Sequence, residues 1–393
     1  MKILQIGKFY PIRGGVEKVM YDLTTGLSSR GVECDMLCAD HEGRGRTIEV
    51  GPKGHVLSCR TWLKLAATML SPSMVSTAMR ICRRYDIVHI HHPDPMACLA
   101  LFCARYKGKI ILHWHSDIVK QKTILQFYRP LQSWLIRRAD LIIGTTPAYL
   151  AGSPWLQKVQ HKCVSLPIGI PTVPEATAEA EALQAKYPGK KIIFSLGRLV
   201  PYKGFEYLVK AASQLSDDYV VLIGGEGPLR ARLEEEIAAR GLQQKVHLLG
   251  YIADSDLPGY FHGCTLFCLP SVFKTEAFGI VQIEAMSCGK PVVATTIEGS
   301  GTSWVNKHGF SGLNATPCNA EELADAISDI TADADSYARY SRNARERYEN
   351  EFTDKKMINT YIELLWKCMN TKKAGMRNAP PTPTARRAQQ HWQ

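Results

Sequence analysis

The 393-residue chain lacks a long apolar run, since its longest uninterrupted one, residues 96–104, has nine residues. A membrane-spanning helix needs about 20 apolar residues, so the sequence predicts no bilayer span. The short apolar segment 3–6 near the start is too small for the core of a signal peptide, and no small-residue cleavage site follows it. We therefore expect a cytoplasmic protein.

Cysteine pairs with metal-binding or redox spacing are also missing. Twelve cysteines occur singly or in two C-x3-C pairs, Cys34/Cys38 and Cys264/Cys268, and no C-x2-C pair occurs. A zinc ribbon or a thioredoxin motif is therefore not indicated. Because disulfides are rare in the cytoplasm, the sequence predicts thiols that pack as small apolar groups.

Acidic residues are scarce in the first part of the chain. Residues 1–170 hold 23 basic and 11 acidic side chains, residues 171–366 hold 19 and 26, and residues 367–393 hold six basic and no acidic ones. The net charge of +11 is therefore unevenly spread. No helix-turn-helix, zinc-finger or RNP signature accompanies the basic half, so we expect no nucleic-acid partner. An anionic membrane surface is the other partner that suits such charge.

The segment 60–84 mixes apolar side chains with arginine and lysine. This mixture is typical of a surface that contacts an anionic membrane, and it predicts peripheral association with the inner face of the cytoplasmic membrane. The alternative is a pair of amphipathic helices, broken at Ser71-Pro72, that pack on the fold. The pattern leaves both open. The basic tail 372–393 has no apolar periodicity and is predicted to be disordered.

Short β-rich segments alternate with helical patterns along the chain, which predicts an α/β fold with parallel sheets covered on both faces. Prolines interrupt the alternation between residues 166 and 184. We therefore expect two doubly wound, Rossmann-like domains that face each other across a ligand-binding cleft. The expected parts are a first domain over 1–170, a second domain over 171–352, a helix over 353–371 that crosses back to the first domain, and the tail 372–393.

Two glycine-containing loops follow predicted strands and open helices. Gly14-Gly15 lets the backbone approach an anion beside the amides of a helix N-terminus. Gly197-Arg198 is followed by Lys203, so that two cations can converge on a diphosphate. A tight turn and a pair of solvated cations are the plainer interpretations of these loops.

The segment 224–228 resembles a dinucleotide-binding loop through Gly225 and Gly227. The third glycine position of that fingerprint holds Arg230, so the fingerprint of an NAD(P)-dependent oxidoreductase is incomplete. The plainer interpretation is a compact turn with a backbone role.

The segment 274–285 contains two carboxylates eight residues apart, Glu276 and Glu284. The amides of Phe278 to Val281 lie between them at the N-terminus of a predicted helix, where a phosphate can bind. This spacing suits a sugar nucleotide, with the sugar at Glu276, the diphosphate at the amides and the ribose at Glu284. The alternative is a capping glutamate followed by an ordinary helical one.

Together these motifs resemble the retaining glycosyltransferases of family 4, which have the GT-B fold. Glu276 and Glu284 are similar to the E-x7-E motif of that family, and segments 14–17, 197–204 and 225–228 match it in order. The resemblance extends over nearly the whole chain, and it implies that the domain over 1–170 binds the acceptor and the domain over 171–352 binds the nucleotide sugar. It implies transfer of one sugar with retention of configuration, usually described as front-face attack in which the leaving phosphate helps to deprotonate the acceptor.

The resemblance also implies roles for individual residues. Arg198 and Lys203 would neutralise the leaving diphosphate, and Glu276 would bind the donor sugar. His115 would lie near the anomeric centre, either as a base or as a group that binds a donor hydroxyl. Donor contacts are implied for Gly14, Gly15, Gly197, Gly225, Glu226, Tyr251, Ile252, Phe278, Gly279, Ile280, Val281 and Glu284.

We expect neither a metal ion nor another cofactor, because cationic side chains and amides can stabilise a diphosphate leaving group. Asp254-Ser255-Asp256 resembles a metal-binding pair, but we expect it to cap a helix over 254–262; Asp333-Ala334-Asp335 is expected in a polar turn.

Three histidines follow one another near the end of a predicted strand over 86–91. Alternation places His89 and His91 on one face and His92 in the loop beyond, which favours cleft lining over metal ligation.

The segment 114–118 resembles enzymes of O-antigen and exopolysaccharide assembly. The resemblance implies a hexose donor, with GDP-mannose first, and a lipid-linked saccharide acceptor. The alternatives are a UDP- or dTDP-sugar donor, a GT-B epimerase or phosphorylase, an oxidoreductase, and a non-catalytic module that binds sugar nucleotides.

Overall fold

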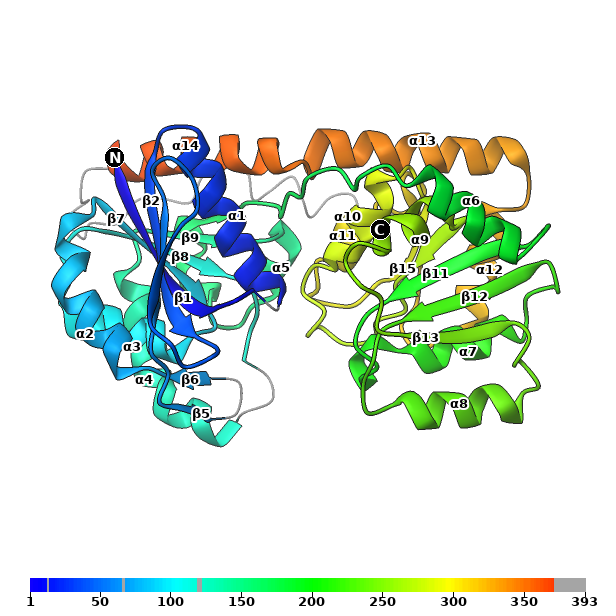
Figure 1. Cartoon of the computed structure of the whole chain (residues 1–393), viewed down its shortest axis with the longest axis horizontal. Helices are drawn as coiled ribbons and strands as arrows, with labels where there is room; N and C mark the ends of the chain where they lie inside the picture. Colours follow the sequence, from blue (N-terminus) through cyan, green and yellow to red (C-terminus); the bar gives the residue numbers. More distant parts are fainter. Residues whose placement is uncertain (13, 66–67, 119–121, 371–393) are drawn as a thin grey trace.

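The structure is a computed structural model that describes residues 1–12, 14–65, 68–118 and 122–370. It forms two lobes, each built on a parallel sheet covered by helices, and two consecutive long helices run along both lobes (Figure 1). The predicted α/β class with two Rossmann-like domains is therefore confirmed. The tail 372–393, predicted to be disordered, lies outside the described residues.

The first sheet has eight strands in the order β10-β9-β8-β7-β1-β2-β4-β3, and all neighbours are parallel except β3 and β4. This order places the carboxyl ends of β1, β7 and β8 side by side at the sheet's centre. Its strands are β1 (Lys2–Tyr10), β2 (Glu33–Asp40), β3 (Arg46–Glu49), β4 (His55–Cys59), β7 (Ile87–His92), β8 (Lys109–Trp114), β9 (Leu141–Gly144) and β10 (Cys163–Ser165).

The second sheet has six parallel strands in the order β13-β12-β11-β14-β15-β16. Its strands are β11 (Lys191–Leu196), β12 (Tyr219–Gly224), β13 (Val246–Gly250), β14 (Leu266–Cys268), β15 (Val292–Thr295) and β16 (Gly312–Ala315).

Helices connect the strands in both lobes. The first lobe has α1 (Gly15–Ser29), α2 (Pro72–Ile81), η1 (Cys82–Arg84), α3 (Pro95–Ala104), α4 (Lys122–Arg138), α5 (Pro147–Gly152) and η2 (Gln157–Lys162). The second has α6 (Thr177–Lys186), η3 (Pro201–Lys203), α7 (Phe205–Ala212), α8 (Arg230–Ala239), α9 (Leu257–Gly263), α10 (Ile280–Ser287), α11 (Thr302–Val305), α12 (Ala320–Ile330) and α13 (Ala334–Glu351), before α14 (Asp354–Asn370).

The segment 60–84 differs from the predicted pair of helices. Its first half is a hairpin of β5 (Leu63–Leu65) and β6 (Thr68–Leu70), in which the Trp62 amide donates to the Leu70 carbonyl. Only the second half is helical, because Ser71 caps α2 by accepting from the Met74 amide. The first helix of that alternative interpretation is therefore replaced by a hairpin.

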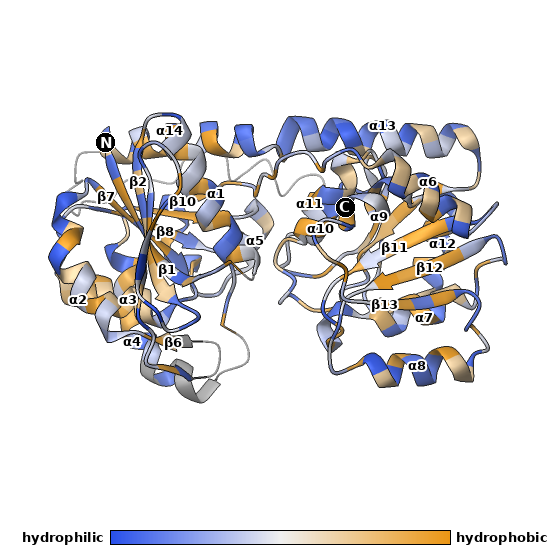
Figure 2. Ribbon diagram, in the orientation of Figure 1, coloured by the Kyte–Doolittle hydropathy of each residue, from blue (hydrophilic) through white to orange (hydrophobic). Residues whose placement is uncertain are grey.

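Apolar side chains lie mainly in the strands and on the inner faces of the helices (Figure 2). The twelve cysteines, all within the described residues, are free, and most are buried, as predicted. None of the helices in the described ranges is long and apolar enough to cross a bilayer.

The chain passes between the lobes twice, and the two passages pair with each other. Ile170 forms a parallel bridge with Thr353, and its amide donates to the Phe352 carbonyl. An ideal Cβ on Gly169 would lie 2.3 Å from the Thr353 carbonyl oxygen, so only glycine permits this approach. After this pairing α14 packs on α1 of the first lobe.

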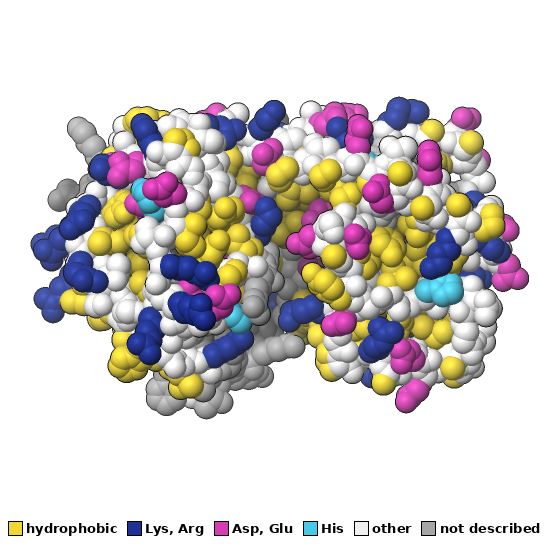
Figure 3. Space-filling model, viewed as in Figure 1, with side chains coloured by type: hydrophobic (Ala, Val, Ile, Leu, Met, Phe, Trp, Pro, Cys, Tyr) yellow, Lys and Arg dark blue, Asp and Glu magenta, His cyan; other side chains and the backbone are white. Residues whose placement is uncertain are grey.

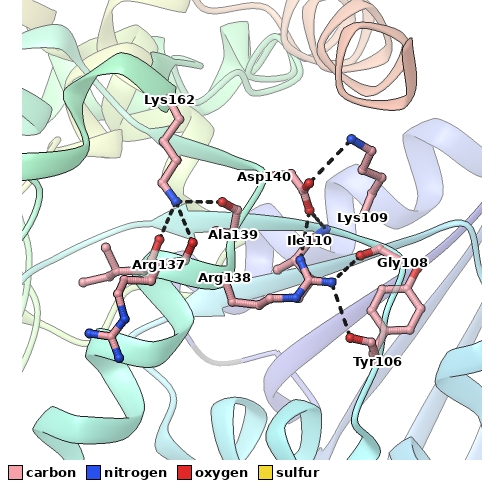
Figure 4. A network of polar contacts seen from close by, with 10 residues as sticks. Tyr106, Gly108, Lys109, Ile110, Arg137, Arg138, Ala139, Asp140 and Lys162 are labelled. Carbon is pink, nitrogen blue, oxygen red and sulfur yellow. Dashed lines mark hydrogen bonds and ion pairs between the residues drawn. The ribbon is translucent and has the colours of Figure 1, made fainter. Parts of the chain in front are cut away.

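A polar network surrounds the C-terminal end of α4 (Figure 4). The Lys162 ammonium donates to the carbonyls of Ile136 and Ala139 at 2.7 Å and of Arg137 at 3.1 Å. Lys162 therefore satisfies carbonyls that the end of a helix leaves without partners. Nearby, Asp140 pairs with an arginine and a lysine.

Candidate active site

A cavity of about 380 Å³ lies between the lobes, where Figure 3 shows a groove. The first lobe contributes the start of α1 and the residues after β8 and β9. The second contributes η3 and the loop that leads into α10. The lining residues are Gly15, Val16, His115, Ser116, Thr145, Ile168, Tyr202, Lys203, Thr275, Glu276, Ala277, Phe278, Gly279, Ile280 and Val281.

Two helix N-termini meet at this cavity. Helix α1 begins at Gly15 and helix α10 begins at Ile280. An ideal Cβ on Gly15 would lie 3.2 Å from the Ile280 Cδ1, so the two helix ends are almost in contact. The first amides of each helix lack intrahelical acceptors and carry partial positive charge. The cavity can therefore hold an anion between them.

The structure brings together Lys203 and Glu276, two of the residues predicted for catalysis. The Lys203 Nζ lies 2.6 Å from the Glu276 Oε2, and the Ser271 hydroxyl donates to the same carboxylate at 3.0 Å. Arg198 is exposed outside the lining, with its Nη2 3.5 Å from the hydroxyl of Tyr202, which does line the cavity. One of the two predicted cations is therefore inside the cavity and the other is beside it.

The predicted glycines of the second lobe hold three strand ends together. Gly225 has a φ of +122°, and an ideal Cβ there would lie 2.0 Å from the Gly197 carbonyl oxygen. Its amide donates to the Gly250 carbonyl. These glycines therefore let the strand ends approach each other. Several residues predicted to contact the donor or to act in catalysis line neither this cavity nor the second one described next. They are Gly14, Gly197, Arg198, Gly225, Glu226, Tyr251 and Ile252.

Glu284 lies in an adjoining cavity of about 340 Å³, which Lys18 and Asp22 of α1 line from the other lobe. Burial, together with the nearby Asp254 and against an opposing effect of Lys18, raises the pKa of Glu284 to about 7. Ile168 and Ile280 line both cavities, so the cavity that holds Glu276 and the cavity that holds Glu284 are neighbours.

Asp254 was predicted to cap a helix, and this was wrong. Helix α9 begins three residues later at Leu257, and its N-cap, Asp256, makes no side-chain capping bond. Asp254 instead lines the cavity that holds Glu284. Asp333 does cap α13, with its carboxylate accepting from the Ser336 amide.

Four buried histidines stack on the first sheet beneath α1 and α14. His89 and His91 come from β7, and His113 and His115 follow on or directly after β8. Burial lowers the pKa of all four rings, so they are neutral. His92 is the last residue of β7 and is buried, so its predicted place in the loop was wrong.

Ring nitrogens of His89, His91 and His113 lie within 4.8 Å of one another. Both nitrogens of His91 are engaged, however: Nδ1 with the His115 Nε2 at 2.9 Å and Nε2 with the Gln5 Oε1 at 2.7 Å. A cation would have to displace one of these hydrogen bonds.

The sequence analysis missed several residues at the cavity. Thr145 and Tyr202 line it, and the Lys274 ammonium lies 3.6 Å from the Asp117 carboxylate of the other lobe. Thr145 directly follows the apolar strand β9, and its position at a strand end is a signal that could have identified it. No sequence pattern indicates the ion pair, because its partners are 157 positions apart.

Comparisons with known proteins agree with this geometry. Residues 177–347 match the family described as Glycosyl transferases group 1, and residues 13–152 match Glycosyltransferase Family 4. The O-antigen chain mannosyltransferase C of Escherichia coli is 31% identical, over 95% of this chain and 100% of its own. The D-rhamnosyltransferase WbpZ of Pseudomonas aeruginosa is also 31% identical, over 90% of this chain and 92% of its own.

Solved structures with 22–23% identity share the fold. Anabaena HepE in complex with UDP has a TM-score of 0.76 and covers 93% of this chain and 100% of its own. Sucrose-phosphate synthase from Thermosynechococcus elongatus has a TM-score of 0.78, over 93% and 99%. The chain therefore belongs to the family 4 glycosyltransferases with the GT-B fold, in which retention of configuration and metal independence are typical.

Proposed function

We propose that the chain transfers a hexose, with retention of configuration, from a nucleotide-diphosphate sugar to a lipid-linked saccharide in the synthesis of a surface polysaccharide or O-antigen. The names of the mannosyl- and rhamnosyltransferase relatives support this reaction class. GDP-mannose is the donor we place first, and UDP- and dTDP-sugars are the alternatives.

One observation carries the proposal: residues from both lobes line a single cavity that contains a lysine–glutamate pair and two helix N-termini. The donor diphosphate would lie between the helix ends, against Gly15 and the amides of Phe278 to Val281. Lys203, with Arg198 beside the cavity, would neutralise the charge that grows on the diphosphate as it leaves. No metal ion is required for this step.

The carboxylates would bind the two sugars of the donor. Glu276 would accept from hydroxyls of the transferred hexose, and Glu284 would accept from the ribose in the adjoining cavity. The base would lie against the backbone near Tyr251 and Ile252. The attacking acceptor oxygen would lose its proton with help from the leaving phosphate.

The experiment that tests this proposal is a screen of GDP-, UDP- and dTDP-sugars for thermal stabilisation, followed by transfer assays with the best donor. A ligand at 100 times its dissociation constant adds about 2.7 kcal/mol to stability, which is readily measured. We expect stabilisation by one donor and transfer that persists in EDTA. Consumption of donor without an acceptor would indicate an epimerase instead, and loss of activity that Mn²⁺ restores would exclude the metal-free reaction.

We also propose that the first lobe contacts an anionic membrane, which would bring the cleft to a lipid-linked acceptor. Apolar side chains are exposed on three adjoining elements: Trp62 and Leu63 at the β5–β6 hairpin, Met79 on α2, and Leu99 and Phe102 on α3. The arginines and lysines around them are exposed as well, and Figure 3 shows basic side chains gathered over this lobe. Apolar side chains within a basic surface suit an anionic lipid interface.

A further inference from the structure

The buried amide of Gln5 on β1 has an orientation that its partners determine. Its Nε2 lies 3.1 Å from the Met20 carbonyl oxygen and 2.7 Å from the Thr24 Oγ1. A backbone carbonyl can only accept, and the Thr24 hydroxyl already donates to that same carbonyl. The NH2 group of Gln5 must therefore face α1, and its Oε1 must face His91.

This orientation determines which nitrogen of each following histidine carries a hydrogen. The Gln5 Oε1 can only accept, so the His91 Nε2, 2.7 Å away, must donate. Because His91 is neutral, its Nδ1 then has a lone pair and accepts from the His115 Nε2 at 2.9 Å. His115 therefore carries its hydrogen on Nε2, which leaves Nδ1 as an acceptor, and no described residue donates to it.

We propose that Gln5 and His91 are positioning residues that hold His115 as the neutral Nε2–H tautomer, so that its Nδ1 accepts a hydrogen bond from a hydroxyl of the donor sugar. The proposal rests on the proposed function, because it assigns a ligand to a residue of the same cavity. The sequence left two roles open for His115, a general base and a group that binds a donor hydroxyl. The proposal selects the second.

The surroundings of His115 disfavour a positive charge on its ring. The chain of hydrogen bonds ends in an amide, which neither takes up a proton nor carries the negative charge that would stabilise an imidazolium. The groups packed around the ring are the imidazoles of His89, His91, His92 and His113 and the ammonium of Lys8. Burial and these neighbours lower the pKa of His115 well below its usual range.

The test is ¹⁵N NMR of the full chain, selectively labelled at histidine and free of ligand. Signals that disappear in His115→Gln identify the ring, and the exposed His161→Gln serves as the matched control. We expect a pyrrole-type Nε2 and a pyridine-type Nδ1 at neutral pH. A hydrogen on Nδ1, an imidazolium, or stoichiometric zinc bound at the histidines in elemental analysis would overturn the proposal.

The variant His91→Phe tests the positioning role, since it keeps a ring but removes the acceptor. We expect the His115 signals to move toward an average of the two tautomers and kcat/KM to fall about tenfold, the scale of one lost hydrogen bond. The pH profile of kcat should keep its shape, whereas a general base would produce a new or shifted inflection. The tautomer is observed without substrate, so an inactive protein with the expected tautomer would contradict only the proposed transfer reaction.

Discussion

The ammonium of Lys203 lies 2.6 Å from the carboxylate of Glu276, and each side chain keeps only 11% of its exposure. The two charges therefore compensate each other while the cavity holds no ligand. A donor diphosphate would compete with Glu276 for the lysine, and a sugar hydroxyl would donate to the glutamate in return. This ion pair therefore provides one partner for the donor diphosphate, Lys203, and one for the donor hexose, Glu276.

Glu276→Gln preserves the shape of the side chain and removes its charge. We expect transfer to fall by about 10²–10³-fold, because a positioned charge in a partly buried site is lost. Initial rates with the donor found in the stabilisation screen measure this effect, and circular dichroism checks the fold. The control is Glu181→Gln on the exposed surface of α6. Undiminished transfer by the Glu276 variant would contradict the assigned site.

Glu284→Gln should change how stability depends on pH. The native carboxyl keeps its proton up to a pKa of about 7, whereas an unfolded glutamate titrates at about 4.3. At a pH between these two pKa values the native state binds more protons than the unfolded state. The free energy of unfolding of the wild type therefore falls as the pH rises, and it levels off above pH 7.

Glutamine does not titrate. The free energy of unfolding of the variant, relative to that of the wild type, should therefore increase from pH 5 to pH 8. Urea unfolding at both pH values measures this difference, with Glu181→Gln as the control. An identical pH dependence in the wild type and in Glu284→Gln would show that Glu284 is not held in its protonated form.

Tyr361→Phe tests the contact of α14 with the first lobe. The Tyr361 hydroxyl lies 2.6 Å from the His89 Nδ1, and both residues are fully buried. Removal of the hydroxyl leaves a buried ring nitrogen without a partner, which should cost about 1–3 kcal/mol. Chemical denaturation measures the loss, and Tyr187→Phe is the control, because its hydroxyl makes no hydrogen bond among the described residues. Equal stability of the two variants would refute this contribution.

Lys162→Met should destabilise the fold without altering the active site. The variant keeps the apolar stem of the side chain but removes three hydrogen bonds to the end of α4 (Figure 4). We expect a loss of about 1–3 kcal/mol, seen as a lower Tm. The exposed Lys158→Met should leave the Tm unchanged. A changed KM for the donor in the folded Lys162 variant would argue against a purely structural role.

The double variant Trp62→Ser, Leu63→Ser tests the proposed membrane surface. We expect binding to phosphatidylglycerol vesicles to weaken by about tenfold or more, because two exposed apolar side chains no longer enter the interface. Co-sedimentation measures binding, and it should decrease with added salt. Tyr251→Ser, at a similarly exposed aromatic residue of the other lobe, should bind like the wild type.

The sequence predicts the two sheets well because their central strands are buried runs that are separated by helices. The strand predicted over 86–91, for example, is β7 (Ile87–His92), shifted by one residue. A helix was one interpretation of the segment that contains the hairpin at 63–70, because its apolar and basic residues fit a helical pattern as well. Backbone pairing between the two strands decides the outcome.

The sequence likewise predicts one part of the candidate site and not another. Glycines, cations and carboxylates beside strand ends could be identified, because parallel strands bring their carboxyl ends to one edge. The contacts of Asp254 with the Glu284 cavity and of Gln5 with His91 could not, because they depend on how distant segments pack.

The pairing of α14 with the first lobe has a consequence for synthesis of the protein. The first 165 residues contain every strand of the first sheet, yet Ile358 and Tyr361 near the end of the chain cover part of its core. An ideal Cβ on Gly26 of α1 would lie 2.5 Å from the Ile358 Cδ1, so this cover fits closely. While the ribosome is still translating the second lobe, part of the apolar core of the first lobe is therefore uncovered. The first lobe can complete its packing only after α14 has left the ribosome.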